Sequence, residues 1–239
     1  MRLLDRFRLF CSKKGYTCDV CGREIFNYPT RRLCEQCESV IIRNNGYACE
    51  KCGRSTKALG PCLSCKKTLP LFSKGGSPFV YQDKAAELVN RFKNGARYLA
   101  GLFSEEMIKT LYERFSNPQE FLITYVPITK AKKTKRGFNQ SRELALFISE
   151  KTGLEMQDDV LVKTRDEAQQ KHLNREERKE NVEGAFRVHK RKLVKNRRVL
   201  LIDDIMTTGA TASECTRVLK NAGAKEVCVL TVSATPELK

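Results

Sequence analysis

The chain has 239 residues, of which 41% are hydrophobic and 31% are charged. This balance is typical of a folded globular protein, and the length suits one large domain or two smaller ones. No apolar run approaches the ~20 residues of a membrane span. Arginines and an aspartate interrupt the apolar residues of the stretch 1–10, which excludes a secretory signal and predicts a cytoplasmic protein.

The formal net charge of +17 is concentrated towards the N-terminus. Residues 1–75 carry 15 basic and 6 acidic side chains, whereas residues 76–239 carry 30 and 22. Such an excess of positive charge attracts polyanions, and nucleic acid is the leading candidate. A lysine-rich surface that serves only solubility is the alternative.

Eight of the eleven cysteines form four Cys-x2-Cys pairs, arranged as an internal repeat of two units. In a reducing compartment such pairs are more often metal ligands than disulfides. Sequential pairing predicts two structural zinc sites, each closed by four thiolates: Cys18, Cys21, Cys34 and Cys37 in the first, and Cys49, Cys52, Cys62 and Cys65 in the second. Interleaved pairing and an iron–sulfur cluster are the alternatives.

Basic and aromatic side chains accompany these cysteines. We expect eight basic residues to decorate the surface of a zinc module that docks nucleic acid or protein: Arg31, Arg32, Arg43, Lys51, Arg54, Lys57, Lys66 and Lys67. Four aromatic residues could stack on the bases of a single strand, although packing in a small core is their simpler role: Tyr16, Phe26, Tyr28 and Tyr47.

Residues 72–78 (FSKGGSP) have the composition of a hinge, which divides the chain into a cysteine-rich module at 1–75 and a second domain at 76–239. The second domain alternates apolar strands with helical segments. Strands are predicted at 78–82, 121–126, 198–203 and 226–232, and helices at 85–93, 98–115, 140–151 and 210–221. This order predicts an α/β fold with a mostly parallel sheet between helices, whose ligands bind beyond the carboxyl ends of the strands.

Residues 199–211 (VLLIDDIMTTGAT) contain the densest group of side chains that could bind a ligand. An apolar strand ends in Asp203 and Asp204, and a Thr/Gly turn then opens a helix. A helix start with free N–H groups, a glycine and several hydroxyls can hold a phosphate. Paired carboxylates suit the hydroxyls of a ribose or, through water, a divalent cation. The segment therefore predicts a site for a phosphorylated sugar.

Residues 199–211 resemble the 5-phosphoribosyl-1-pyrophosphate motif of type I phosphoribosyltransferases. The resemblance implies that Asp203 and Asp204, also the candidate catalytic residues, meet the ribose hydroxyls, and that Mg²⁺ accompanies the ligand. It implies that the 5′-phosphate is held by Thr207, Thr208, Gly209, Ala210 and Thr211, and that a turn at Pro127 and Ile128 presents backbone N–H groups to the pyrophosphate. The whole chain resembles the ComF family of competence-associated proteins through this motif, the cysteine-rich N-terminus and the segments 91–97, 126–128, 136–140 and 170–186.

A basic loop is predicted directly after Ile128, at the ligand edge of the sheet. Its five positive charges make it a candidate nucleic-acid or anion contact: Lys130, Lys132, Lys133, Lys135 and Arg136. The polar segment 165–181 is expected to be a mobile loop like the one that closes over substrate in phosphoribosyltransferases, with His172 as a bystander. Residues 187–198 are predicted to form an exposed basic connection.

Three functions fit these features. The first is a competence protein that handles single-stranded DNA, binds phosphoribosyl pyrophosphate, and has a ComFA-like helicase ATPase and other uptake proteins as partners. The second is a transferase of ribose 5-phosphate to a small acceptor; its acceptor hood would have to come from the zinc module or residues 83–115, because the chain stops at Lys239, soon after the last strand. The third is a protein adaptor with a vestigial site.

Overall fold

The computed structural model of the chain describes residues 15–26, 30–164 and 182–237. The predictions for residues 1–10, Tyr28, His172 and the whole segment 165–181 lie outside the described residues. Within the part of the chain that is described, no helix is both long and apolar enough to cross a bilayer.

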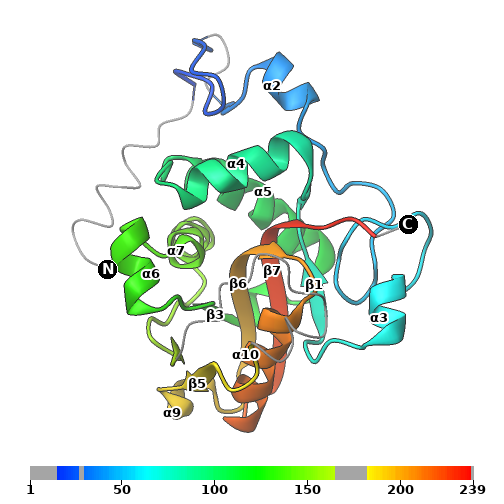
Figure 1. The fold of residues 1–239 in the computed structure, drawn as a ribbon, viewed down its shortest axis with the longest axis vertical. Coiled ribbons are helices and arrows are strands. Elements are labelled where there is room, and N and C mark those ends of the chain that lie inside the picture. The colour runs from blue at the N-terminus through cyan, green and yellow to red at the C-terminus, as the bar shows by residue number, and fades with distance from the viewer. Residues whose placement is uncertain (1–14, 27–29, 165–181, 238–239) are drawn as a thin grey trace.

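A parallel sheet organises the larger part of the fold (Figure 1). Its strand order is β1-β7-β6-β3, and β2 pairs with β7 further along the same edge as β1. The strands are β1 (Lys74–Gly76), β2 (Phe79–Val80), β3 (Phe121–Tyr125), β6 (Arg198–Met206) and β7 (Glu226–Ala234). The mostly parallel sheet predicted from the sequence is therefore confirmed.

Helices cover both faces of this sheet (Figure 1). On one face lie α4 (Asp83–Lys93), α5 (Leu99–Arg114) and α7 (Gln140–Thr152), whereas α10 (Ala210–Asn221) lies on the other. Along β6, Leu200 and Ile202 belong to the first apolar cluster, and Val199 and Leu201 belong to the second. Continuous apolar strands of this kind are typical of parallel sheets buried on both sides.

The predicted strands and helices are all present, with shifted ends. The strand predicted at 198–203 continues to Met206, so that Asp204 lies within β6 together with Asp203. The predicted basic loop is wrong, because Lys130–Arg136 form helix α6. This helix has a capping side chain at its start, where the Thr129 side chain accepts the N–H of Lys132, and it ends at Gly137 with a φ of 78°.

A second, two-stranded sheet was not predicted. It pairs β4 (Leu161–Lys163) antiparallel to β5 (Phe186–Val188), and a short helix, α9 (Arg191–Val194), follows. The predicted exposed connection at 187–198 is therefore partly structured. At its end the Arg198 side chain is only 14% exposed and forms ion pairs with Glu120 and Glu226.

The predicted hinge is also wrong. The Phe72 side chain is fully buried, and Lys74–Gly76 form the edge strand β1, which pairs with residues 228–230 of β7. Gly75 further donates its N–H to the carbonyl oxygen of Lys51 at 2.7 Å, so that this strand is held on both sides. The division of the chain at residue 75 stays a prediction, but the segment that crosses it is a fixed strand.

The two cysteine units each pack into one of the two apolar cores. Cys18, Cys34 and Cys37 of the first unit share a buried cluster with side chains of α4 and α5, whereas Cys21 is exposed. The four cysteines of the second unit share a cluster with Phe72 and one face of β6 and β7. Each unit carries a single-turn helix, α2 (Glu35–Ser39) or α3 (Leu63–Lys67). The cysteine-rich segment is therefore packed against the sheet domain at two places.

Candidate functional site: two cysteine clusters and a ribose-phosphate edge

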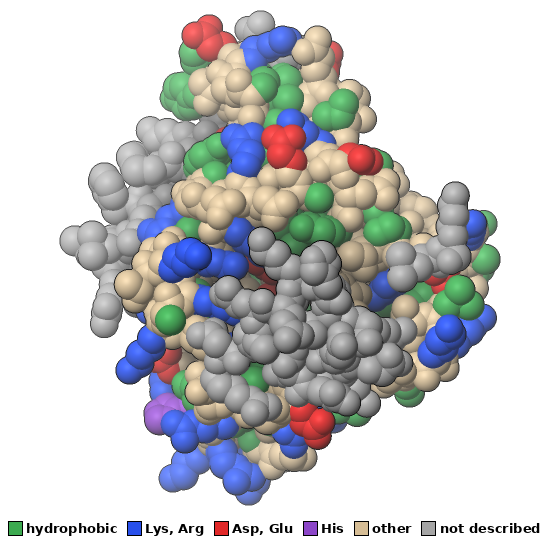
Figure 2. Space-filling view, in the orientation of Figure 1, with side chains coloured by type: hydrophobic (Ala, Val, Ile, Leu, Met, Phe, Trp, Pro, Cys, Tyr) green, Lys and Arg blue, Asp and Glu red, His purple; other side chains and the backbone are tan. Residues whose placement is uncertain are grey.

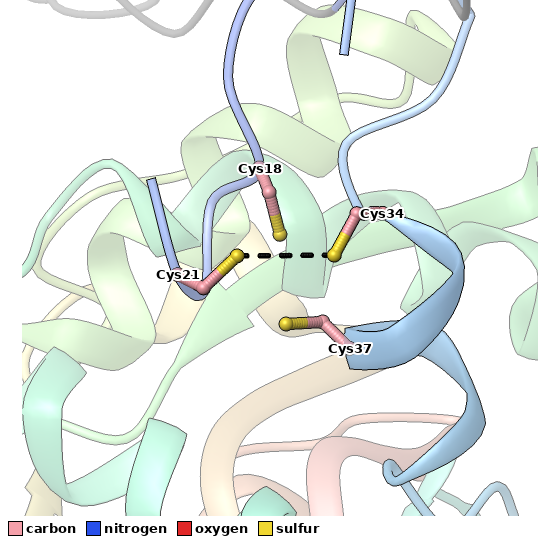
Figure 3. A group of neighbouring side chains, drawn as sticks. All are labelled: Cys18, Cys21, Cys34 and Cys37. Atoms are coloured by element: carbon pink, nitrogen blue, oxygen red, sulfur yellow. Dashed lines mark hydrogen bonds between the residues drawn. The ribbon is translucent and has the colours of Figure 1, made fainter. Parts of the chain in front are cut away.

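The eight paired cysteines form two clusters whose sulfur atoms lie within 4.8 Å of one another. In the first cluster the four side chains point towards a common centre (Figure 3). The Sγ atoms of Cys21 and Cys34 are 3.8 Å apart, and those of Cys52 and Cys62 in the second cluster are 3.7 Å apart. A tetrahedral ion with Zn–S bonds of about 2.3 Å places its ligands about 3.8 Å apart. Each cluster could therefore bind one zinc ion, and the pairing is sequential.

The internal repeat is also visible in the backbone around the clusters. In each unit the first cysteine donates its N–H to the carbonyl of the arginine five residues later, at 2.7 Å for Cys18 and 2.9 Å for Cys49. Gly22 and Gly53 follow the second cysteine of their units, and both have a φ of 74°. This left-handed backbone favours glycine. The two units therefore have the same local turn.

Several arginines of the cysteine-rich segment dock it onto the sheet domain instead of decorating its surface. Arg32 and Arg54 are buried, at 6% and 4% exposure. Arg32 pairs with Asp19 at 3.3 Å and with Glu105 of α5 at 3.0 Å. Burial raises the pKa of Asp19 to about 6, in spite of the opposing charge of Arg32. The surface role predicted for Arg32 and Arg54 is therefore wrong.

The predicted ribose carboxylates lie at the carboxyl end of β6, beside the turn that precedes α10. A small hollow of about 30 Å³ is lined by Asp203 and by residues 205–212. Gly209 takes a φ of 80°, and Ala210 at the helix start donates its N–H to the Thr208 hydroxyl at 3.3 Å. The structure thus brings Asp203 together with Thr207, Thr208, Gly209, Ala210 and Thr211, in the arrangement expected for a phosphate cradle.

Two side chains that the sequence analysis did not select hold the carboxylates in place. Ser141, in the first turn of α7, donates its hydroxyl proton to Asp203 Oδ1 at 3.0 Å. Lys93, the last residue of α4, places its Nζ 3.2 Å from Asp204 Oδ2. Burial, together with the neighbouring Asp204 carboxylate, raises the pKa of Asp203 to about 7. Lys93 lies inside the segment 91–97 that resembles the ComF family, and Ser141 directly follows the segment 136–140. Their position in or beside these segments is the feature of the sequence that could have identified them as site residues.

Pro127 and Ile128 leave β3 at the same edge of the sheet. Tyr125 pairs with Ile202 of β6, and Val126 donates its N–H to the Ile202 carbonyl at 3.0 Å. Pro127 is buried and Ile128 is half-buried. This register places the predicted pyrophosphate turn beside the strand that carries the two carboxylates.

Helix α6 and the end of α4 enclose a cationic pocket of about 310 Å³. Its lining consists of Lys93, Asn94, Lys132, Lys135 and Arg136. The other two basic residues predicted as anion contacts, Lys130 and Lys133, are exposed on the same helix. In Figure 2, Lys and Arg side chains gather over α6 and again around β5 and α9. The predicted basic cluster therefore supplies both a pocket wall and an exposed face.

A second pocket, of about 540 Å³, adjoins the turn that precedes α10. Residues 67–71, which start at the last residue of α3, form one wall, and residues 208–210 form another. Ser213, Glu214 and Arg217 of α10 complete the described lining together with Glu183. The walls of this pocket come from segments far apart along the chain, so the sequence alone did not indicate it.

A parallel sheet with paired carboxylates and a Thr/Gly turn at its ligand edge defines a phosphoribosyltransferase-type domain. The phosphoribosyl transferase domain family matches residues 131–239 of this chain. The chain is 30% identical over 203 residues to the competence protein ComFC of Streptococcus pneumoniae, covering 82% of this chain and 84% of that protein. The chain therefore belongs to the ComF family of competence proteins.

Two further comparisons gave matches. The chain is 27% identical over 216 residues to the DNA utilization protein YhgH of Escherichia coli K12, covering 89% of this chain and 87% of that protein. A structure of the glutamine phosphoribosylpyrophosphate amidotransferase from B. subtilis, complexed with ADP and GMP, matches with 21% identity and a TM-score of 0.39. That match covers 57% of this chain and 26% of the amidotransferase.

Proposed function

We propose that this protein handles single-stranded DNA in the cytoplasm during natural transformation and binds 5-phosphoribosyl-1-pyrophosphate, with Mg²⁺, at the carboxyl edge of its sheet. The observation that carries the proposal is that three features lie next to one another along that edge: the turn 207–211, the paired carboxylates, and the cationic pocket. Two relatives are named a competence protein and a DNA utilization protein, and these names support the DNA-handling role.

The carboxyl edge of the sheet offers a partner for each part of phosphoribosyl pyrophosphate. Phosphoribosyl pyrophosphate has a phosphate at one end of its ribose and a pyrophosphate at the other. The N–H groups and hydroxyls of residues 207–211 suit the phosphate, and the two carboxylates accept hydrogen bonds from the ribose hydroxyls. The cationic pocket suits the pyrophosphate, and Lys93 belongs both to that pocket and to the ion pair with Asp204. Mg²⁺ would add positive charge between the pyrophosphate oxygens.

Exposed aromatic rings on the cysteine units support contact with a single strand. Tyr16, Phe26 and Tyr47 are 55%, 58% and 54% exposed, so the simpler role of core packing is wrong for these three. Tyr16 and Phe26 stand edge to face, with ring centroids 6.1 Å apart. Exposed rings next to basic side chains are the usual components of a surface that binds single strands without sequence preference.

Each cysteine cluster would hold a structural zinc ion. Four thiolates complete the tetrahedron, so that no coordination position remains for a substrate. Zinc bound in this way contributes about 10–16 kcal/mol to the folding of small zinc peptides. Two zinc ions per chain in an elemental measurement would support this assignment, whereas iron with visible absorbance would favour the iron–sulfur alternative.

The decisive experiment is fluorescence anisotropy of a labelled single strand, titrated with protein at several salt concentrations, with and without phosphoribosyl pyrophosphate and Mg²⁺. We expect salt-sensitive binding whose affinity changes when the small ligand is added. Protein with both Asp203 and Asp204 replaced by Asn is the matched control and should lose only the response to the ligand. Absence of DNA binding at low salt would refute the DNA-handling role. Capture of a ComFA-like helicase ATPase by the tagged protein would test the predicted partner.

An active phosphoribosyltransferase is the second candidate, and the pocket of about 540 Å³ favours it. The pocket adjoins residues 208–210, and its opposite wall, residues 67–71, comes from the cysteine-rich segment. This segment would then supply the acceptor hood. Mg²⁺-dependent release of pyrophosphate on addition of small amines or bases would establish transfer, and pyrophosphate release that no acceptor stimulates would count against it.

A further inference from the structure

Arg54 joins the second cysteine cluster to the phosphate turn. Its Nε donates to the Sγ of Cys52 at 3.3 Å, and its Nη2 donates to the carbonyl oxygen of Thr207 at 2.7 Å. The side chain is 4% exposed. One buried guanidinium therefore contacts both a candidate metal ligand and the first residue of the turn that would hold the phosphate.

Thr235 contacts both Arg54 and Thr207. Thr235, just after β7, lies 3.5 Å from Arg54 Nη1 and donates its hydroxyl proton to the same Thr207 carbonyl at 3.3 Å. It also donates its N–H to the carbonyl of Met206 at 3.0 Å. The end of β6 and the start of the turn are thus fixed by three hydrogen bonds, of which the shortest is charge-assisted and comes from Arg54 of the cysteine unit.

The second unit is attached to the end of the chain at further points. Leu63 donates its N–H to Glu237 Oε1 at 2.6 Å, and Glu237 donates its N–H to the carbonyl of Ser55 at 3.2 Å. These bonds hold the backbone that follows Arg54 against the segment after β7. A change in the shape of the cluster would therefore move groups that contact the turn.

The internal repeat supplies a natural comparison. Arg23 follows Cys21 and Gly22 in the first unit, as Arg54 follows Cys52 and Gly53 in the second. Arg23 is exposed, whereas Arg54 is buried between the cluster and the turn. The same sequence position thus has a surface role in one unit and an internal contact in the other.

We propose that Arg54 couples the metal occupancy of the second cysteine cluster to the ribose-phosphate site, so that the site is formed only while this cluster holds its ion. The inference rests on the proposed function. With four sulfurs fixed on one ion, Cys52 offers Arg54 a stationary acceptor, and the guanidinium holds the Thr207 carbonyl. A buried guanidinium needs fixed acceptors, because an unsatisfied buried charge is costly. Loss of the ion therefore releases Arg54 and loosens the turn.

The test compares Arg54→Met with Arg23→Met in the full chain. Phosphoribosyl pyrophosphate affinity is measured by calorimetry, zinc content by elemental analysis, and backbone hydrogen exchange over residues 204–211 by mass spectrometry. For Arg54→Met we expect a loss of affinity of roughly tenfold, equal to one charge-assisted hydrogen bond, and faster exchange in the turn. Zinc content should remain at two, and Arg23→Met should match the unmodified protein. Unchanged affinity and exchange in Arg54→Met would overturn the coupling.

A second arm needs no change at Arg54, and so it does not depend on the folding of that variant. Graded chelation of the unmodified protein is followed by exchange over 204–211, and Cys21→Ser, in the first cluster, serves as the control that loses the other ion. Release of the second ion should speed exchange in the turn, whereas loss of the first should not. Equal effects from both clusters would overturn the proposal. Exchange is read without ligand, so failure to bind phosphoribosyl pyrophosphate would refute the proposed function and leave the coupling separately testable.

Discussion

The paired glycines of the two cysteine units allow a sharp test of how the second unit sits on the sheet. Gly22 and Gly53 occupy the same place in the repeat and share a φ of 74°. A Cβ added at Gly22 would meet nothing within 4 Å, whereas one added at Gly53 would lie 2.4 Å from the carbonyl oxygen of Gly75 in β1. Gly22→Ala and Gly53→Ala therefore share a backbone cost and differ only in the contact with the sheet.

The expected magnitudes follow from these contacts. Alanine in the left-handed region costs about 1 kcal/mol at either position. At Gly53 the overpacking adds about 1–3 kcal/mol. A shift of β1 to relieve it would weaken the 2.7 Å hydrogen bond from Gly75 to Lys51, which is worth about 1 kcal/mol. We therefore expect Gly22→Ala to cost about 1 kcal/mol and Gly53→Ala about 3–5 kcal/mol.

Thermal unfolding of both variants, with metal bound and at matched concentration, measures the difference. For a chain of this size 1 kcal/mol shifts the Tm by about 2–4 °C, so we expect a decrease of about 3 °C for Gly22→Ala and about 12 °C for Gly53→Ala. Faster hydrogen exchange at residues 74–76 should accompany only the second variant. Equal decreases in the Tm would refute the reasoning, because they would mean that Gly53 does not lie against β1.

Three further predictions concern the ligand edge. Replacing both Asp203 and Asp204 with Asn should abolish binding of phosphoribosyl pyrophosphate in calorimetry without changing the circular dichroism spectrum; retained affinity would contradict the site assignment. Because the pKa of Asp203 is raised to about 7 from its ordinary value near 4, the folded chain holds a proton that the unfolded chain has lost, so its contribution to stability falls as the pH rises from about 4 to 7. Urea unfolding should show Asp203→Asn gaining stability relative to the unmodified protein across that window, and a constant difference would argue against the raised pKa. Replacing Lys132, Lys133 and Lys135 with Gln should reduce the slope of log affinity for single-stranded DNA against log salt by about 2, and an unchanged slope would place the DNA elsewhere.

The sheet and the phosphate turn could be predicted because their signals are local. An apolar run followed by Asp203, Asp204 and a Thr/Gly turn can be recognised from neighbouring residues alone, without knowledge of any distant contact. Strand β1 was missed because Lys74–Gly76 has no apolar side chain. A tertiary contact requires glycine in this strand, because a Cβ at Gly75 would lie 2.7 Å from the carbonyl oxygen of Cys52. Composition indicated a hinge where close packing requires the same residues.

The errors at the site have a similar cause. Helix α6 was missed because its sequence, KAKKTKR, has no apolar face, although Thr129 and Gly137 are ordinary cap residues on either side of it. The arginines of the cysteine units were assigned to the surface because charge usually lies there. Only the fold reveals that Arg32 and Arg54 have acceptors inside the protein. A single sequence does not reveal the contacts of a residue whose partners lie far along the chain.

The pairing of β1 with β7 sets the order in which a growing chain can reach its final form. Lys74 lies opposite Cys228, so the edge strand waits for about 150 further residues, or roughly 8–30 s of synthesis, before its partner exists. During this interval the cysteine units lack the part of the sheet that later covers them. Metal acquired during translation would protect their thiols from oxidation and mispairing, so a cell short of zinc should accumulate the damaged nascent protein before any effect on the mature form.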